Sequence, residues 1–314
     1  MKKYDTFHLV IAKYCFFRYD IKKCWGGIIV ITLREKAYAK INLSLDVLSR
    51  RPDGYHDLKG VMQSVSLGDD IELDLGTGKE WELVCGQEGV PCDSRNLAWK
   101  AAALFFRCAR IDPEGITIRI TKNVPSGAGM GGGSADAAAV LRALNRHYGN
   151  PYTAEELAAL GAEVGSDVPF CVMMGTAVAE GRGEILHRLP DIPKCPIVLC
   201  KPEFSISTPV LFRRLDAEEI LHRPDHEAME KAICEGSLTG IAAQVLNVFE
   251  PAVSCDHPEI EHIKGICMDC GALTAQMTGS GSVVFALMPD STAAKLAMDR
   301  LLKFYPQTFL AEPV

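Results

Sequence analysis

A glycine-rich segment at residues 125–134 most constrains the fold, because it joins two runs of different periodicity. Residues 116–121 alternate isoleucine with polar residues, a pattern typical of a half-buried strand. Residues 135–148 are rich in alanine and leucine and stop before Pro151, which predicts a helix. A strand, a glycine loop and a helix in this order predict an anion site, since glycine exposes backbone N–H groups and a helix N-terminus is positive.

Two familiar nucleotide-binding motifs fit this loop poorly. Gly127, Gly129 and Gly132 match G-x-G-x-x-G, but a dinucleotide site needs an acidic residue about 20 positions later, at the end of a strand. Here that region predicts a helix capped by Thr153. A P-loop needs a lysine before its serine, and Ser134 follows a glycine. The loop is therefore predicted to bind a phosphate chain, naturally a triphosphate; the alternative is a glycine-rich turn that closes over tight helix packing.

The rest of the chain predicts two units that mix helices with strands. Its 314 residues exceed the roughly 100–200 residues of one ordinary domain. Strand patterns dominate up to residue 121, with a turn expected at residues 68–70. The last third alternates helices with short strands, as expected for helices on an antiparallel sheet. We expect an α+β fold with an extension at 1–33 outside the catalytic fold, a first domain at 34–195 and a second at 196–314.

Charge and cysteine content exclude several classes of protein. The 33 basic and 40 acidic side chains give a formal net charge of −7, so we expect no nucleic-acid partner and no membrane surface. The apolar run at residues 7–17 is too short to span a bilayer. Twelve scattered cysteines predict reduced thiols in a cytoplasmic protein. Separately, we expect a monomer or a weak homodimer that binds a small-molecule substrate. Cys267 and Cys270 have zinc-knuckle spacing but lack a second pair, so we expect buried thiols.

The glycine loop and four outer motifs together resemble a known superfamily. Residues 125–138 resemble the phosphate-binding motif of the galactokinase, homoserine kinase, mevalonate kinase and phosphomevalonate kinase superfamily. The outer motifs narrow the resemblance to a member that phosphorylates a cytidine-diphosphate-linked methylerythritol. They are Ala39-Lys40-Ile41-Asn42-Leu43, Arg51-Pro52-Asp53-Gly54-Tyr55-His56, Gly165-Ser166-Asp167-Val168-Pro169-Phe170 and Gly181-Arg182-Gly183-Glu184.

This resemblance covers the chain from residue 36 to about residue 285 and implies both a fold and a reaction. The fold has an N-terminal unit like ribosomal protein S5 domain 2 and a ferredoxin-like C-terminal unit. The reaction transfers the γ-phosphoryl group of ATP, with Mg²⁺, to the substrate's 2-hydroxyl in the non-mevalonate route to isoprenoid precursors. Two alternatives stay open: another small-molecule kinase or decarboxylase of the superfamily, and a catalytically silent, metabolite-sensing relative.

The resemblance also implies the catalytic residues. Asp167 is expected to be the catalytic base and Lys40 its charged partner, with Asn42 in the substrate pocket. Residues 39–47 alternate as a strand, so Lys40 and Asn42 lie on one face of it. An ordinary aspartate is anionic at neutral pH, and a nearby cation would orient it toward the attacking hydroxyl. Taken singly, Lys40 could be a solvated strand residue and Asp167 a helix N-cap.

Binding residues carried over from the resemblance fall into two groups. Tyr55 and His56 match positions that receive the cytidine base, by stacking and by reading the base edge, and Phe212 resembles the residue that stacks from the other side. Gly279 and Ser280 match a loop beside the phosphates. The expected nucleotide-binding residues are Pro125, Ser126, Gly127, Ala128, Gly129, Met130, Gly131, Gly132, Gly133, Ser134 and Asn96. The expected substrate-binding residues are Asn42, Tyr55, His56, Thr208, Phe212, Gly279 and Ser280.

Overall fold

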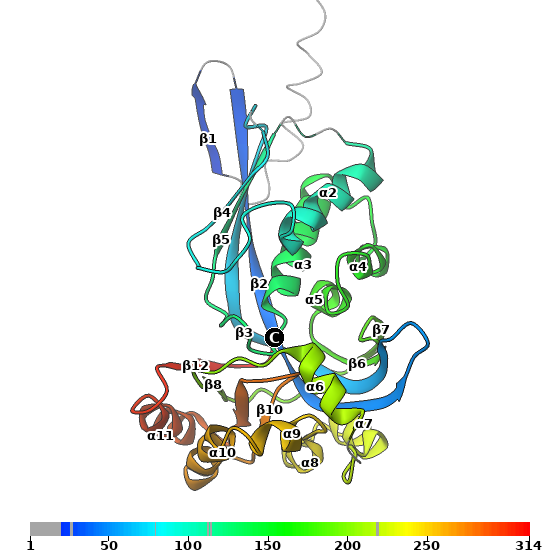
Figure 1. The fold of residues 1–314 in the computed structure, drawn as a ribbon. Coiled ribbons are helices and arrows are strands. Elements are labelled where there is room, and N and C mark those ends of the chain that lie inside the picture. Colours follow the sequence, from blue (N-terminus) through cyan, green and yellow to red (C-terminus); the bar gives the residue numbers. More distant parts are fainter. Residues whose placement is uncertain (1–19, 26–27, 79, 112, 114, 218–219) are drawn as a thin grey trace, which may run out of the picture.

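The larger of two sheets is built on two long antiparallel strands, β2 (Ile28–Arg50) and β3 (His56–Leu75) (Figure 1). The computed structural model describes residues 20–25, 28–78, 80–111, 113, 115–217 and 220–314. Within these residues the strand order is β1-β2-β3-β5-β4, with β6 on β3, β7 on β6 and β9 on β2. The further strands are β1 (Asp20–Trp25), β4 (Glu82–Cys85), β5 (Ile116–Thr121), β6 (Thr176–Gly181), β7 (Ile185–Leu189) and β9 (Leu246–Asn247).

Four helices pack together on one side of this sheet (Figure 1). They are α2 (Leu97–Ala109), α3 (Gly132–His147), α4 (Ala154–Ala162) and α5 (Val168–Met173). Alanines of α3 are fully buried against the sheet, so the small-residue run lets this helix approach it closely. The predicted capping box is confirmed: Thr153 accepts from the Glu156 N–H group and the Glu156 carboxylate accepts from the Thr153 N–H group.

The turn expected at residues 68–70 is wrong, because β3 continues through them. Gly68 lies against β2, where an added Cβ would sit 2.6 Å from the Ala37 carbonyl oxygen. Asp69 is fully buried, and its carboxylate accepts from the backbone N–H groups of Asn123 and Val124. Glycine and aspartate are common in turns, but here Gly68 allows close strand packing and Asp69 holds the segment that leads into the glycine loop.

At the N-terminal end, the sheet starts earlier than the sequence suggested. Strand β2 begins at Ile28, so the expected start of the first domain at residue 34 falls inside it. Strand β1 pairs antiparallel with β2, with Asp20 opposite Thr32. The apolar run at residues 7–17 lies outside the described residues. Residues 28–33 thus belong to a strand whose later part carries Lys40 and Asn42.

The second sheet confirms the expected ferredoxin-like unit. Its strands lie in the order β10-β11-β8-β12, each antiparallel to its neighbour. Numbered along the chain, this order is 2-3-1-4. The connections from strand 1 to strand 2 and from strand 3 to strand 4 each cross over one intervening strand of the sheet. The strands are β8 (Ile197–Lys201), β10 (Thr274–Met277), β11 (Val284–Leu287) and β12 (Gln307–Ala311). The helices of this half are α6 (Thr208–Leu215), α7 (His226–Cys234), α8 (Leu238–Gln244), α9 (Glu250–Ser254), α10 (Glu259–Asp269) and α11 (Ser291–Leu301).

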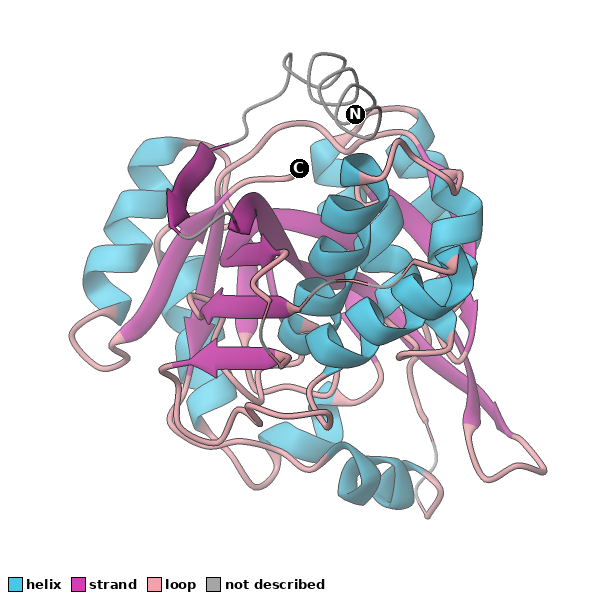
Figure 2. Ribbon diagram, turned by 90° about the horizontal axis from the view of Figure 1, so that it is seen from above, coloured by secondary structure: helices cyan, strands magenta, loops and turns pink. Residues whose placement is uncertain are grey.

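Both halves of the chain meet on β2. The short strand β9 pairs parallel with β2, with Leu246 opposite Ser44. Strand β9 thus joins the first sheet, although it follows β8 of the second sheet, which begins at Ile197. Figure 2 shows helices flanking the strands on both sides. Cys267 and Cys270 are buried, and the described residues hold no group of three or more metal-ligating side chains. No helix in the described part of the chain has the length and hydrophobicity needed to cross a bilayer.

Candidate active site

A cleft of about 1040 Å³ lies between the two halves of the molecule. The glycine loop, β2, the start of α5 and the start of α6 all contribute to its walls. Every residue named above for catalysis, nucleotide binding or substrate binding lines this one cleft. The individual roles of these residues stay predictions, and the contacts below show what each side chain is free to do.

The glycine loop presents an uncapped helix N-terminus to the cleft. Gly131 is the N-cap residue of α3, has a φ of 68° and supplies no side chain to cap the helix. The first backbone N–H groups of α3 therefore remain available to an anion, and the helix dipole favours negative charge there. Gly129 must be glycine, because an added Cβ would lie 2.3 Å from the Thr278 carbonyl oxygen.

Lys40 is held at the centre of the cleft by β2 and the glycine loop. Its backbone N–H group donates to the Met130 carbonyl oxygen, which fixes the loop against the strand. The side chain is only 4% exposed, so Lys40 is not a solvated strand residue. Its ammonium group donates to Asn42 Oδ1 over 2.6 Å, as expected for two residues on one strand face. Among the described residues Asn42 is the one acceptor given for this ammonium group, so donors are left for a ligand in the cleft.

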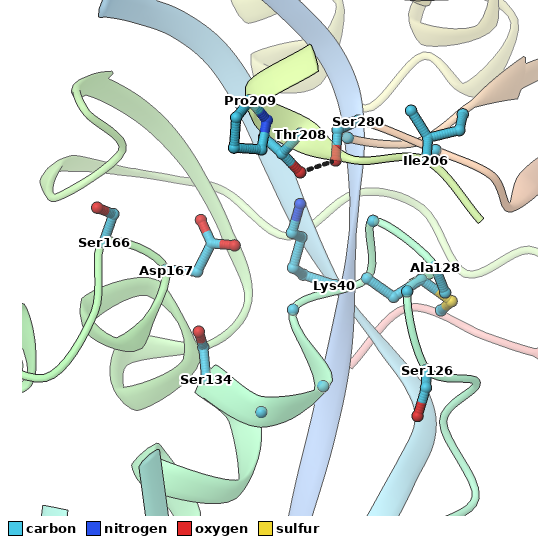
Figure 3. Close-up of a pocket in the computed structure, with 18 of the residues that line it drawn as sticks. Lys40, Ser126, Ala128, Ser134, Ser166, Asp167, Ile206, Thr208, Pro209 and Ser280 are labelled. Carbon is cyan, nitrogen blue, oxygen red and sulfur yellow. Dashed lines mark hydrogen bonds between the residues drawn. The ribbon is translucent and has the colours of Figure 1, made fainter. Parts of the chain in front are cut away.

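Asp167 sits at the N-cap position of α5 but makes no capping hydrogen bond with its side chain. In the described part of the chain its carboxylate has no hydrogen-bond partner and no ion pair within 4.0 Å. It points toward Lys40 (Figure 3), and both side chains lie against Gly131, 3.6 and 3.4 Å from an added Cβ there. The cation expected beside Asp167 is thus near, but its direct partner is Asn42.

The aromatic end of the cleft is organised around His56. Its imidazole stacks on Phe212, with ring centroids 4.6 Å apart and planes inclined by 15°. His56 Nε2 lies 2.7 Å from Oδ1 of Asp216, the C-cap residue that follows α6. Tyr55 is 57% exposed, and the Arg182 guanidinium lies 5.1 Å from its ring centroid. Phe212 therefore faces His56 here, and a base placed between Tyr55 and Phe212 would have to displace that stack.

Two hydroxyl groups line the cleft where the start of α6 meets the Gly279–Gly281 loop. Thr208, the first residue of α6, is hydrogen-bonded to Ser280 over 2.8 Å between their side-chain oxygens (Figure 3). Asn96 lines the wall beyond the loop, but its side chain caps α2 by accepting from the Ala98 N–H group and donates to the Pro91 carbonyl oxygen. Both ends of the Asn96 amide are therefore engaged in shaping the wall.

Sequence reasoning missed a buried ion cluster beneath the glycine loop. Lys122 donates to Asp69 and to Asp136, the latter over 2.8 Å. Asp136 Oδ1 is buried without a hydrogen-bond partner, and burial raises the pKa of Asp136 to about 7. The sequence did contain a signal for this cluster: Asp136 lies within the alanine run of α3, and a charged residue in a buried helix needs a partner.

Known proteins match this chain over most of its length. The model of the GHMP kinases N terminal domain matches residues 96–175, and that of the GHMP kinases C terminal matches residues 217–307. A 4-diphosphocytidyl-2-C-methyl-D-erythritol kinase of Geobacillus thermodenitrificans is 45% identical over 278 residues, which are 88% of this chain and 95% of that protein. A protein of the same name from Caldicellulosiruptor saccharolyticus is 42% identical over 275 residues, 88% of this chain and 94% of that one.

Solved structures agree with this match. The crystal structure of a 4-(cytidine 5'-diphospho)-2C-methyl-D-erythritol kinase superposes with a TM-score of 0.75 at 30% identity and covers 89% of this chain and 98% of that one. A homoserine kinase from Cytophaga hutchinsonii, at 20% identity and a TM-score of 0.71, covers 90% and 94% and shares the fold. With relatives above 40% identity over nearly their whole length, the chain belongs to the 4-diphosphocytidyl-2-C-methyl-D-erythritol kinase family of the GHMP kinases.

Proposed function

We propose that this protein transfers the γ-phosphoryl group of ATP to the 2-hydroxyl of 4-diphosphocytidyl-2-C-methyl-D-erythritol, a step toward isoprenoid precursors. The observation that carries the proposal is one cleft that joins an uncapped phosphate loop, an unpaired aspartate among the described residues and an aromatic end. The names of the relatives supply the acceptor. We further propose a cytoplasmic enzyme, because the ten cysteines from Cys85 to Cys270 are free thiols.

The phosphate chain of ATP would lie along the glycine loop. The N–H groups at the start of α3 are donors without a capping side chain, and the positive end of this long helix lies beneath them. Lys40 adds an ammonium group from β2 that retains free N–H donors. Phosphoryl transfer depends mainly on positioning and on charge stabilisation, and these groups supply both without any covalent chemistry of the protein.

Magnesium fits the oxygen atoms that face the cleft. Mg²⁺ takes one or two protein oxygens and completes its shell with phosphate oxygens and water, so a dedicated cluster of ligands is not required. The Ser134 hydroxyl and the Asp167 carboxylate both face the cleft (Figure 3), and neither has a hydrogen-bond partner within the described residues. We propose Ser134 as the protein ligand nearest the phosphates. The bound ion would neutralise charge on the transferring phosphoryl group.

Asp167 would accept the proton of the attacking 2-hydroxyl. Because no capping bond or ion pair restrains its carboxylate, both oxygens can accept a hydrogen bond. The Lys40 ammonium stands close by and stabilises negative charge as it develops. Asn42 accepts from Lys40 and so fixes the direction of the ammonium group. Phe212, once it moves off His56, would stack on the cytidine base together with Tyr55 while His56 reads the base edge, which places the hydroxyl near the γ-phosphate.

A substrate panel tests the proposed function. Purified protein is assayed for ADP release with ATP and Mg²⁺ against the cytidine-linked methylerythritol, homoserine and mevalonate in parallel. We expect turnover with the cytidine substrate alone. Equal or greater turnover with homoserine or mevalonate would refute the proposed acceptor, and ADP release independent of any acceptor would refute the kinase assignment.

A further inference from the structure

Asn247 is a buried side chain outside the cleft with an unusual set of partners. It is 1% exposed and lies on β9. Its amide nitrogen donates to two backbone carbonyl oxygens, those of Met277 and Gly279, each over 2.8 Å. Its amide oxygen accepts from the Phe249 N–H group over 3.0 Å. Both donors therefore hold the segment that enters the Gly279–Gly281 loop.

The same segment is held from the opposite side by β2. Thr278 is fully buried, and its hydroxyl accepts from the Asn42 N–H group over 2.9 Å. Asn42 is also the acceptor for the Lys40 ammonium. Because β9 pairs with β2 only a few residues beyond Asn42, Asn247 and Thr278 fasten the loop to the strand that carries Lys40.

The fastened loop in turn packs backbone against backbone on the glycine loop. An added Cβ on Gly279 would lie 2.6 Å from the Gly129 carbonyl oxygen. The Val283 N–H group donates to the Ala128 carbonyl oxygen over 3.3 Å. Interlocked loops of this kind leave no space for independent movement. A shift of the Gly279–Gly281 loop would therefore move the backbone that faces the phosphates.

We propose that Asn247 and Thr278 are positioning residues, which set the phosphate-binding loop and Ser280 at the correct distance from Lys40. This inference rests on the proposed function and deepens it. The two side chains touch no ligand themselves, and they act through the backbone of the Gly279–Gly281 loop. A displacement of about 1 Å at such a distance can reduce turnover about a hundredfold.

Two substitutions remove these contacts with little change in volume. Asn247→Asp keeps the oxygen that accepts from Phe249 and removes the paired N–H donors. Thr278→Val removes the hydroxyl, whereas Thr278→Ser retains it. We expect Asn247→Asp and Thr278→Val to lower kcat about 10- to 100-fold and to weaken a non-hydrolysable ATP analogue about 3- to 10-fold. Thr278→Ser should restore both values, and CDP affinity should stay unchanged throughout.

Asn145→Asp is the matched control. Asn145 is also buried, at 7% exposure, and its amide both donates to and accepts from the backbone of Tyr152, away from the cleft. This variant should lower the unfolding temperature while kcat and the affinity for the ATP analogue stay at wild-type values. It separates loss of a buried amide contact in general from loss of loop positioning.

The outcomes separate this inference from the proposed function. Wild-type kcat and wild-type affinity for the ATP analogue in a folded Asn247→Asp or Thr278→Val variant would overturn the inference. If wild-type protein does not phosphorylate the cytidine substrate, the proposed function fails, and binding of the ATP analogue alone decides the inference. If Asn247→Asp does not fold, the Val and Ser variants of Thr278 decide it.

Discussion

Replacing Asp167 by asparagine should lower kcat about 10²- to 10⁴-fold and leave folding intact. The side chain occupies the N-cap position of α5 without capping it, and within the described residues it has no ion pair. Asparagine has nearly the same shape and is itself favourable at an N-cap. The substitution therefore removes no stabilising contact, and it takes away only the charge and the ability to accept a proton.

The expected magnitude follows from these contacts. General-base catalysis contributes about 10²- to 10⁴-fold to a rate, so a thousandfold fall in kcat corresponds to about 4 kcal/mol of barrier. Substitutions that break no contact change the unfolding free energy by about 0.5 kcal/mol or less. Affinity for ATP should stay within a few fold of wild type, because the N–H groups at the start of α3, which we propose to hold the phosphates, need no side chain of Asp167.

A second N-cap aspartate provides the control. Asp290 caps α11 by accepting from the N–H groups of Thr292 and Ala293, far from the cleft. Asp290→Ala should lose about 1 kcal/mol of stability and no activity, the reverse of Asp167→Asn. Steady-state ADP release measures kcat, binding of an ATP analogue measures the affinity for ATP, and thermal unfolding measures stability. A folded Asp167→Asn variant with kcat within tenfold of wild type would refute the role of Asp167 as base.

Other perturbations test the aromatic end and the buried cluster. Phe212→Ala removes the ring that stacks on His56, so initial rates should show about a tenfold higher KM for the cytidine substrate. An equal rise in the KM for ATP would show that Phe212 does not belong to the cytidine pocket. Lys122→Met leaves Asp69 and Asp136 uncompensated, and denaturant titration should show a loss of about 3–5 kcal/mol; unchanged stability would contradict this. Burial raises the pKa of Asp136 from 3.8 to about 7, so the stability that this carboxyl contributes falls as the pH rises from 3.8 to about 7. Asp136→Asn should flatten that part of the curve of unfolding free energy against pH. An unchanged curve would count against the raised pKa.

Features that depend on neighbours along the chain were predictable from the sequence. The glycine loop joins β5 to α3 because residues without side chains allow a tight turn and alanine favours helix, and both are local rules. The capping box of Thr153 and Glu156 is equally local. The ferredoxin-like unit was implied by family resemblance, and the strand order confirms it.

Contacts between distant segments were not predictable in the same way. Gly68 and Asp69 resemble a turn in the sequence, and only the approach of β2 and of the segment before the glycine loop shows why they lie in a strand. Strand periodicity placed Lys40 and Asn42 on one face, but it could not show that the ammonium group binds Asn42 instead of Asp167. Tertiary packing selects among partners that a linear pattern leaves equivalent.

The product of the reaction provides the most direct test of the proposed function. Wild-type protein is incubated with ATP, Mg²⁺ and 4-diphosphocytidyl-2-C-methyl-D-erythritol, and the mixture is followed by phosphorus NMR with ADP measured in parallel. We predict one new phosphomonoester signal without three-bond proton coupling, because C2 carries a methyl group and no hydrogen, in equal amount to ADP and with the diphosphate bridge intact. Inorganic phosphate in place of the ester, or a phosphate on another hydroxyl, would contradict the arrangement of Asp167, Lys40 and the glycine loop described here.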